Sequence, residues 1–183
     1  MLAGPALHDS CVRTLAEWRP PNPDQDQLRQ SYLDHLASQA NGWSRHCRDA
    51  HLTASSLICA PSRRRLLLTL HARIGRWLQT GGHLESDDID PAAAALREGT
   101  EESGLSPLRV DPDPLLLSRH SLICGGVATF HLDVQFLVIA DDFRDLRLTA
   151  ESRDLRWFDL DQLPDIDHSV SALVDAAAVR LGW

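Results

Sequence analysis

The spacing of apolar residues predicts two helices at the start of the chain. In DSCVRTLAEW, Val12, Leu15 and Trp18 recur at helical intervals. Asp9 or Ser10 can cap the helix that contains them. The prolines of PPNPD end this segment, because proline disrupts a helix interior. The stretch QDQLRQSYLDHLAS then repeats the helical spacing and runs to an Asn-Gly turn, with apolar positions at Leu28, Tyr32, Leu33 and Leu36.

From His51 the pattern changes to that of strands. Two apolar runs joined by a short turn, ASSLICA, PSRR and RLLLTL, predict a hairpin. GRWLQTGG predicts one further strand that ends in glycines, and a helix over residues 91–103 follows. The remaining expected elements are the short strands PLRV, PLLLSR and DLRWFDL and the closing helix SVSALVDAAAVRLGW. Strands interrupted by helices indicate a mixed α/β fold.

The strongest strand signal is VATFHLDVQFLVIA, which alternates apolar and polar residues. One interpretation of its polar set is the lining of a pocket, and an exposed strand face is the simpler one. The apolar set comprises Phe130, Leu132, Val134, Phe136 and Val138, and the polar set comprises His131, Asp133 and Gln135.

Length and charge limit the classes of function. A chain of 183 residues with 43% hydrophobic residues can bury the core of one domain. We expect a helical extension over residues 1–50 and a main domain over 51–183. The sequence has no apolar run near the roughly 20 residues of a membrane span and no signal-like start, so we expect a cytoplasmic protein. The net charge of −8 argues against binding to duplex nucleic acid or to anionic membrane, but allows a small phosphorylated substrate.

The cysteines favour reduced thiols over a disulfide framework. The four cysteines lack CxxC spacing. His46, Cys47 and His51 lie close together in the sequence, as zinc ligands often do. A fourth ligand at the usual spacing is lacking, so structural or surface roles are favoured for these three residues.

The helix expected after the glycines has clear start and stop signals. Asp90 can cap it, Pro91 suits its first position, and Gly104 is placed to end it. At 100° per residue its small and apolar positions would lie on the sheet, while its acidic face would look into a groove. We expect Ala94 on the acidic face, where it leaves room beside the carboxylates of Glu98, Glu101 and Glu102.

Three glutamates crowd the end of this helix, where the macrodipole is already negative. Glu98 and Glu102 are also like charges at i,i+4, which costs about 0.2–0.5 kcal/mol. A solvated charged surface is the alternative, but a bound cation would relieve the repulsion. Clustered carboxylates suit Mg²⁺ or Mn²⁺, hard ions that prefer oxygen ligands.

The order of these residues resembles the signature box of the Nudix hydrolase family, G-x5-E-x7-R-E-U-x-E-E-x-G-U, where U is a bulky aliphatic residue. Gly82 is followed by five residues, Asp88, eight residues and REGTEESGL, which ends at Leu105. The departures are Asp88 in place of glutamate, one extra residue before Arg97, and Gly99 in place of the aliphatic residue. The extra residue leaves the role of Asp88 open, while the core carboxylates are retained.

The resemblance covers roughly residues 52–165 and implies an α/β/α sandwich around a mixed sheet. It also implies Mg²⁺-dependent hydrolysis of the diphosphate linkage in a nucleoside diphosphate joined to another moiety. The identity of the nucleotide-type substrate stays open, and a homodimer is compatible with the family.

The resemblance assigns roles residue by residue. Glu101 and Glu102 match the metal-binding pair, and Glu98 matches a position that is a metal ligand in some members and a general base in others. Arg97 matches the arginine that orients the carboxylates, and Gly81 matches a residue whose carbonyl binds metal. In a later loop, Glu151 resembles an acidic ligand or base, for which a solvated glutamate is an equal alternative.

Substrate contacts are assigned more broadly. His83 follows the glycines and can contact a phosphate or ribose, although a surface histidine is favoured. Arg73 and Arg76 can bind phosphate, and Trp77 can stack on a base, although a core tryptophan is favoured. His131 and Asp133 are the candidates on the long strand.

Two other classes compete with hydrolysis. Isopentenyl diphosphate isomerase shares the fold but needs a cysteine near the first sheet, and LQTGGHLES has none. A catalytically inactive ligand-sensing or protein-interaction module usually loses box carboxylates, whereas this chain keeps all three.

Overall fold

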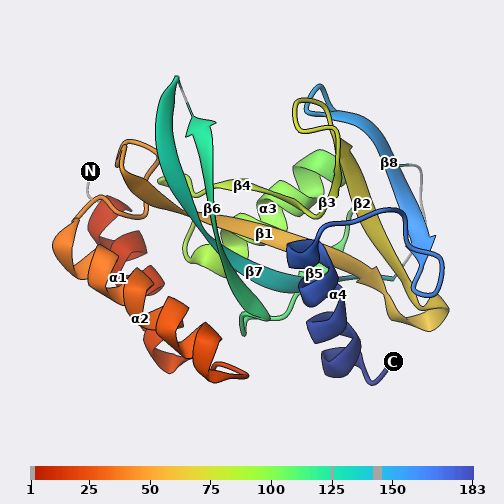
Figure 1. Cartoon of the computed structure of the whole chain (residues 1–183), viewed down its shortest axis with the longest axis horizontal. Helices are drawn as coiled ribbons and strands as arrows, with labels where there is room; N and C mark the ends of the chain where they lie inside the picture. The colour runs from red at the N-terminus through yellow and green to blue at the C-terminus, as the bar shows by residue number, and fades with distance from the viewer. Residues whose placement is uncertain (1–2, 125, 142–145) are drawn as a thin grey trace.

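The computed structural model describes residues 3–124, 126–141 and 146–183, which form four α-helices and one mixed sheet (Figure 1). The helices are α1 (Ala3–Glu17), α2 (Pro23–Ser38), α3 (Pro91–Ser103) and α4 (His168–Leu181), with a 3-10 turn η1 (Pro61–Arg63). The strands are β1 (Ala50–Ala60), β2 (Arg65–His71), β3 (Trp77–Leu78), β4 (Thr80–His83), β5 (Leu108–Val110), β6 (Leu116–Cys124), β7 (Val127–Ala140) and β8 (Ser152–Asp159).

Strand β1 is the centre of the sheet. It runs parallel to β7 and antiparallel to β2 and β4. The path β3-β2-β1-β7-β5 forms the main order, while β6 pairs with β7 and β8 pairs with β2. The parallel pairing sets His51 opposite His131 and Thr53 opposite Asp133, so polar residues far apart in the sequence become neighbours.

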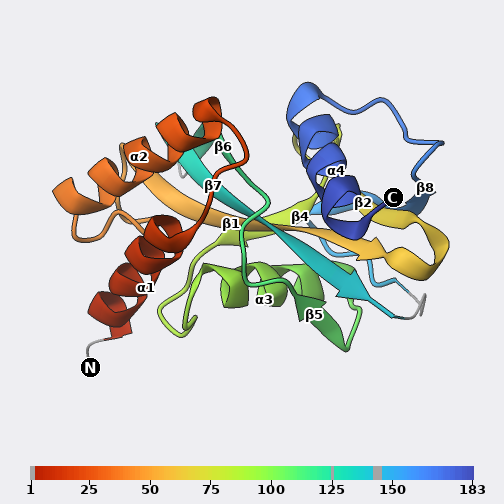
Figure 2. The ribbon, with the colours of Figure 1, turned by 90° about the horizontal axis from the view of Figure 1, so that it is seen from below.

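Helices cover both faces of the sheet, as Figure 2 shows with α3 below it and α4 above it. The even-numbered residues Leu52 and Ala54 of β1 join an apolar cluster with α3. The odd-numbered residues Leu57 and Cys59 join a second cluster with α4. This alternation is the pleat of a strand that is buried on both faces, and the expected α/β/α fold is confirmed.

The N-terminal helices share the first of these clusters through Leu7, Leu15 and Tyr32. The predicted helices are confirmed, but the predicted start of the first is wrong. Helix α1 begins at Ala3, and Ser10 is buried inside it rather than capping it. The second helix is capped by Asn22, whose side chain accepts a hydrogen bond from the amide of Gln25.

The strand expected over GRWLQTGG is two strands. Residues Trp77–Leu78 pair with β2, whereas Thr80–His83 pair with β1, so the chain changes its partner at Gln79. The change places the two glycines at the centre of the sheet, opposite Ala54 and Ser55. Within the described residues, no helix combines the length and apolar character needed to cross a membrane.

Candidate active site

Helix α3 has the bounds that its capping residues predict. Asp90 accepts a hydrogen bond from the amide of Ala93 at 2.7 Å, and Pro91 occupies the first turn. Gly104 ends the helix in the left-handed conformation, with φ of 72°, and its amide donates to Thr100. These local interactions fix where the carboxylates lie along the helix axis.

Gly99 lets α3 lie close to the centre of the sheet. A Cβ atom on Gly99 would lie 2.6 Å from Ser56 Oγ and 3.4 Å from Ile58 Cδ1. A bulky aliphatic residue would therefore push the helix away from β1. The prediction for Ala94 is wrong, because the residue is fully buried in the apolar cluster that α3 shares with α1 rather than lying on an open acidic face.

Arg97 organises the acidic residues around it. Its Nε and Nη2 atoms donate to the two carboxylate oxygens of Asp88, each at 3.0 Å. Its Nη1 atom donates to Glu98 at 3.0 Å and to Glu101 at 3.5 Å. Nη2 also donates to the backbone oxygen of His83 at 2.9 Å. A single guanidinium thus joins the loop before α3, the end of β4 and two glutamates.

Asp88 is the residue whose place sequence reasoning left open. Its side chain is 5% exposed, and it accepts from the amide of Glu85 at 2.8 Å in addition to Arg97. Aspartate is shorter than glutamate by one methylene, and the loop here is longer by one residue. Asp88 nevertheless makes a bidentate contact with the guanidinium from this loop.

The carboxylates of Glu102 and Glu98 lie close to the glycines of β4. Glu102 is 9% exposed, and its Oε1 accepts from the amide of Gly81 at 3.2 Å. A Cβ on Gly82 would lie 2.6 Å from Glu98 Oε1. The pKa of Glu102 is raised to about 7, mainly because burial disfavours the charged carboxylate. The hydrogen bond from the Gly81 amide lowers this pKa, and repulsion from Glu98 raises it further. Burial likewise raises the pKa of Glu98, against the opposing pull of Arg97.

Glu101 and Glu151 complete the acidic group. The Glu101 side chain is 60% exposed and lies 3.5 Å from Arg97. Glu151 lies in the loop before β8, where its backbone oxygen accepts from the amide of Ala72 at 2.8 Å. Its charge contributes to the raised pKa of both Glu98 and Glu102, so it lies within electrostatic reach of the box. The structure therefore gathers Gly81 and the four glutamates into one acidic site.

The predicted substrate contacts divide into two groups. Arg73 is exposed next to Ala72, in the turn that contacts the Glu151 loop. Arg76 pairs with Asp167 at the start of α4, at 3.6 Å. Trp77 is half-buried against the apolar cluster that contains α4. Its ring packs edge-on to that of Phe158, with ring centroids 4.9 Å apart.

The histidines lie together, apart from these arginines. His51, His83 and His131 form a cluster in which one ring nitrogen of each lies within 4.8 Å of the others. Burial is the first cause that lowers the pKa of His83 to about 4 and of His131 to about 3. Neither His46 nor the Cys47 thiol belongs to such a group in the described part of the chain.

The polar side of β7 is buried, so the interpretation as an exposed strand face is wrong. Asp133 is 3% exposed and Gln135 is 2% exposed. The Asp133 carboxylate accepts from Thr53 at 2.9 Å, from Ser55 at 2.6 Å and from Gln135 at 3.2 Å. The clue that sequence reasoning missed is the matching alternation of His51, Thr53 and Ser55 in β1.

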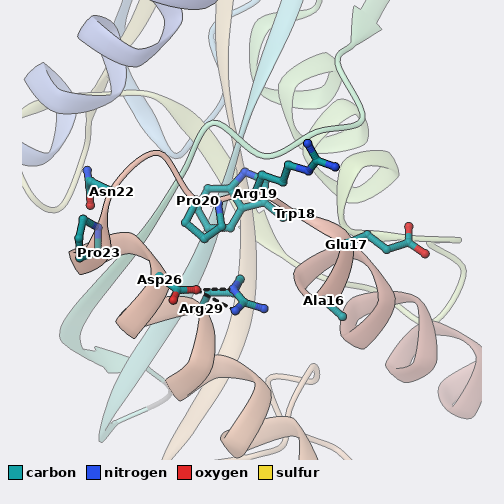
Figure 3. A pocket seen from close by; sticks show the side chains of 9 residues that line it. All are labelled: Ala16, Glu17, Trp18, Arg19, Pro20, Asn22, Pro23, Asp26 and Arg29. Carbon is teal, nitrogen blue, oxygen red and sulfur yellow. Dashed lines mark hydrogen bonds and ion pairs between the residues drawn. The ribbon is translucent and has the colours of Figure 1, made fainter.

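A surface hollow of about 610 Å³ lies elsewhere, at the connection between α1 and α2 (Figure 3). It is lined by residues such as Trp18, Pro20 and Arg29, and Arg29 forms an ion pair with Asp26 there. None of its lining residues belongs to the acidic site, so the hollow and the carboxylates are separate features.

Comparisons with known proteins agree with this architecture. Solved structures that are similar include a Nudix-family hydrolase from Clostridium perfringens, with 20% identity, TM-score 0.54, and 71% of this chain and 97% of that chain covered. The Ap4A hydrolase of C. elegans is 18% identical, with TM-score 0.54 and coverage of 71% and 97%. The NUDIX domain of Shewanella oneidensis NrtR, complexed with ADP ribose, is 17% identical, with TM-score 0.58 and coverage of 81% and 97%. At these identities the likeness shows the fold.

Among curated protein sequences, none matches this chain. The family model of the NUDIX domain matches residues 49–176, which is more than half of the chain and includes the whole acidic site. This chain therefore belongs to the Nudix family and is a Nudix-type diphosphate hydrolase.

Proposed function

We propose that this protein hydrolyses the diphosphate linkage of a nucleoside diphosphate joined to another moiety, and that it does so with Mg²⁺. The observation that carries the proposal is the convergence of Glu98, Glu102 and Gly81 at the centre of the sheet, with Glu101 and Glu151 beside them. Such a site offers several oxygen ligands for a divalent ion.

The residues fit a hard divalent cation. Arg97 is the cation that contacts Glu98 and Glu101, and it is also shared with Asp88. Glu102 is nearly buried and accepts a hydrogen bond from the neutral Gly81 amide, so its negative charge is poorly compensated. A pKa raised to about 7 shows the resulting penalty on the charged form. Carboxylate and carbonyl oxygens at such a position suit Mg²⁺, with Mn²⁺ as a substitute.

In this proposal Glu98, Glu101, Glu102 and the Gly81 carbonyl hold the metal. The chemistry that a bound ion supplies is neutralisation of diphosphate charge and a lowered pKa of a water molecule. The water oxygen attacks one phosphorus, the bridging P–O bond breaks, and a carboxylate of the site accepts the water proton. Glu98 and Glu151 are the two candidates for that base, and Arg97 orients the carboxylates.

The substrate side of the proposal rests on the surrounding loops. Arg73 lies in the turn that contacts the Glu151 loop, so it is the arginine best placed for a substrate phosphate. The other proposed substrate contacts are His83, Arg76, Trp77, His131 and Asp133. A nucleotide substrate is supported by the ADP ribose bound to the Shewanella domain and by the Ap4A hydrolase of C. elegans. We also propose that residues 1–50 are an extension to the catalytic domain, and that the chain forms a homodimer.

A substrate panel tests this proposal. Purified protein is incubated with ADP-ribose, a sugar nucleotide, an oxidised nucleotide, a dinucleoside polyphosphate and a coenzyme, with Mg²⁺ or with EDTA. Released phosphate is counted after treatment with a phosphatase, and products are identified by chromatography. Glu101→Gln and Glu102→Gln keep the shape of the side chain but remove its charge, and the exposed Glu17→Gln is the matched control.

Turnover that needs Mg²⁺, is lost in the two box variants and survives in Glu17→Gln supports the proposal. If the panel gives no turnover with either metal and the protein binds neither, the catalytic proposal fails. The protein is then better described as a ligand-binding module on the Nudix fold.

A further inference from the structure

Three histidines from three strands converge on the face of the sheet that lies opposite α3. His51 lies in β1, His131 lies opposite it in β7, and His83 lies at the end of β4. The ring centroids are 4.9 Å apart for His51 and His131, and 5.1 Å apart for His83 with each of them. One nitrogen from each ring lies within 4.8 Å of the other two.

The rings have the chemistry of metal ligands. His51 is 1% exposed, and its Nδ1 lies 2.9 Å from the backbone oxygen of Cys47. A carbonyl accepts and does not donate, so the proton is on Nδ1 and the lone pair is on Nε2. That Nε2 is buried and has no hydrogen-bond partner, and the same is true of Nε2 of His131. A histidine held by a backbone carbonyl through one nitrogen, with the other nitrogen free, is the arrangement that metal-binding histidines adopt.

We propose that His51, His83 and His131 bind a single Zn²⁺ ion, at a site separate from the carboxylates of α3. Three imidazoles with a fourth position left for water form a common zinc ligand set, whereas hard ions such as Mg²⁺ prefer oxygen. In a tetrahedral site the ligand nitrogens are about 3.4 Å apart, so the ring nitrogens must approach one another by up to about 1.4 Å.

The charges around the cluster are compatible with a cation. Burial lowers the pKa of His51 and of His131, which favours the neutral form of each ring. Arg45 is the positive side chain that acts on His51 and His83, but it is exposed and free to extend into solvent. Asp133, two residues along β7 from His131, places a buried carboxylate on the same face.

The site is linked to the acidic site through one residue. The backbone oxygen of His83 accepts from Arg97, and the amide of nearby Gly81 donates to Glu102. Metal bound to the His83 ring would therefore fix the end of β4 that supports both contacts. The proposal does not depend on the hydrolase activity, because it is read from metal binding.

Metal binding by the full chain tests the proposal. Protein stripped with EDTA and dialysed is titrated with Zn²⁺ against a chromophoric chelator, with excess Mg²⁺ present to saturate the carboxylates. Co²⁺ is then used as a spectroscopic probe, because its visible absorption reports tetrahedral coordination. The variants are His131→Asn and His83→Asn, and the exposed His46→Asn is the matched control. Circular dichroism confirms that each variant is folded before titration.

The expected result is one tight Zn²⁺ ion per chain for wild-type protein and for His46→Asn, with a tetrahedral Co²⁺ spectrum. The affinity should fall at least about 100-fold in each cluster variant, because a ligand is lost outright. His83 lies at the end of a short strand, so His83→Asn gives a readout even if His131→Asn does not fold. Absence of Zn²⁺ binding in wild-type protein would overturn the proposal, and so would equal binding by the folded cluster variants.

Discussion

Replacement of Asp88 by asparagine tests how the loop before α3 holds Arg97. The Asp88 carboxylate receives two hydrogen bonds from the guanidinium and one from the amide of Glu85. Asparagine has nearly the same size, but it has no charge and turns an NH₂ group toward these donors. The variant therefore isolates the charge and the second acceptor oxygen.

The size of the effect follows from the burial of the pair. Loss of one partner of a buried ion pair costs about 3–5 kcal/mol. The Asp88 side chain is 5% exposed, but Arg97 is 23% exposed and keeps its contact with Glu98, so the cost is reduced. We expect Asp88→Asn to lower the free energy of unfolding by about 2–3 kcal/mol, and Tm by about 5–10 °C in a chain of this length. Activity should fall by about 10–100-fold, because the carboxylates lose the group that orients them.

The assay is urea and thermal denaturation followed by circular dichroism, with Asp87→Asn as the control. Asp87 is the neighbouring residue and is exposed, so its variant should change the free energy of unfolding by no more than about 0.5 kcal/mol. If Asp88→Asn is as stable and as active as Asp87→Asn, the bidentate contact does not hold the site together and the reasoning is refuted.

Three further predictions concern the site and the core. Gly81→Ala should lower the free energy of unfolding by more than about 2 kcal/mol, because φ is +155° and the new Cβ would lie 2.4 Å from Ser55 Cβ; unchanged urea denaturation would contradict this. In metal-free protein the pKa of Glu102 is about 7 in the folded state, against an ordinary value of 4.5. Ionisation of Glu102 therefore destabilises the folded state: this loss of stability is absent below about pH 4.5, grows as the pH rises, and is complete above about pH 7. Glu102→Gln should remove this loss of stability, which is about 3 kcal/mol. The prediction is contradicted if the free energies of unfolding of wild-type protein and variant, measured by denaturation, change in parallel from acid to neutral pH. Burial raises the pKa of Cys11 and Cys59 to about 12, so both should resist alkylation in the folded state, as mass spectrometry can measure.

Features set by local sequence were predicted correctly. Helix α3 begins after Asp90 and ends at Gly104 because its caps lie within a few residues of the helix they close. Strand β7 has the bounds of the alternating run that predicted it. The start of α1 was missed because Ser10, which is buried inside the helix, was interpreted as its cap.

Features set by contacts between distant segments were not predicted. Ala94 is buried because α1 packs against α3, and no pattern within α3 itself reveals that neighbour. The histidine cluster depends on the parallel register of β1 and β7, which joins residues 80 positions apart. The contact between Asp88 and Arg97 depends on the path of the folded loop between them, which spacing along the sequence does not fix.

The central claim is that the carboxylates of α3 hold a divalent ion for hydrolysis of a nucleotide diphosphate. The most direct measurement is the rate of phosphate release from the best substrate of the panel as Mg²⁺ is titrated into metal-free wild-type protein, Glu102→Gln and Glu17→Gln. We predict a rate that rises to a plateau with Mg²⁺ for wild-type protein and Glu17→Gln, and a plateau at least about 100-fold lower for Glu102→Gln. A wild-type rate that does not depend on the divalent ion, or a Glu102→Gln rate equal to that of wild-type protein, would contradict the claim.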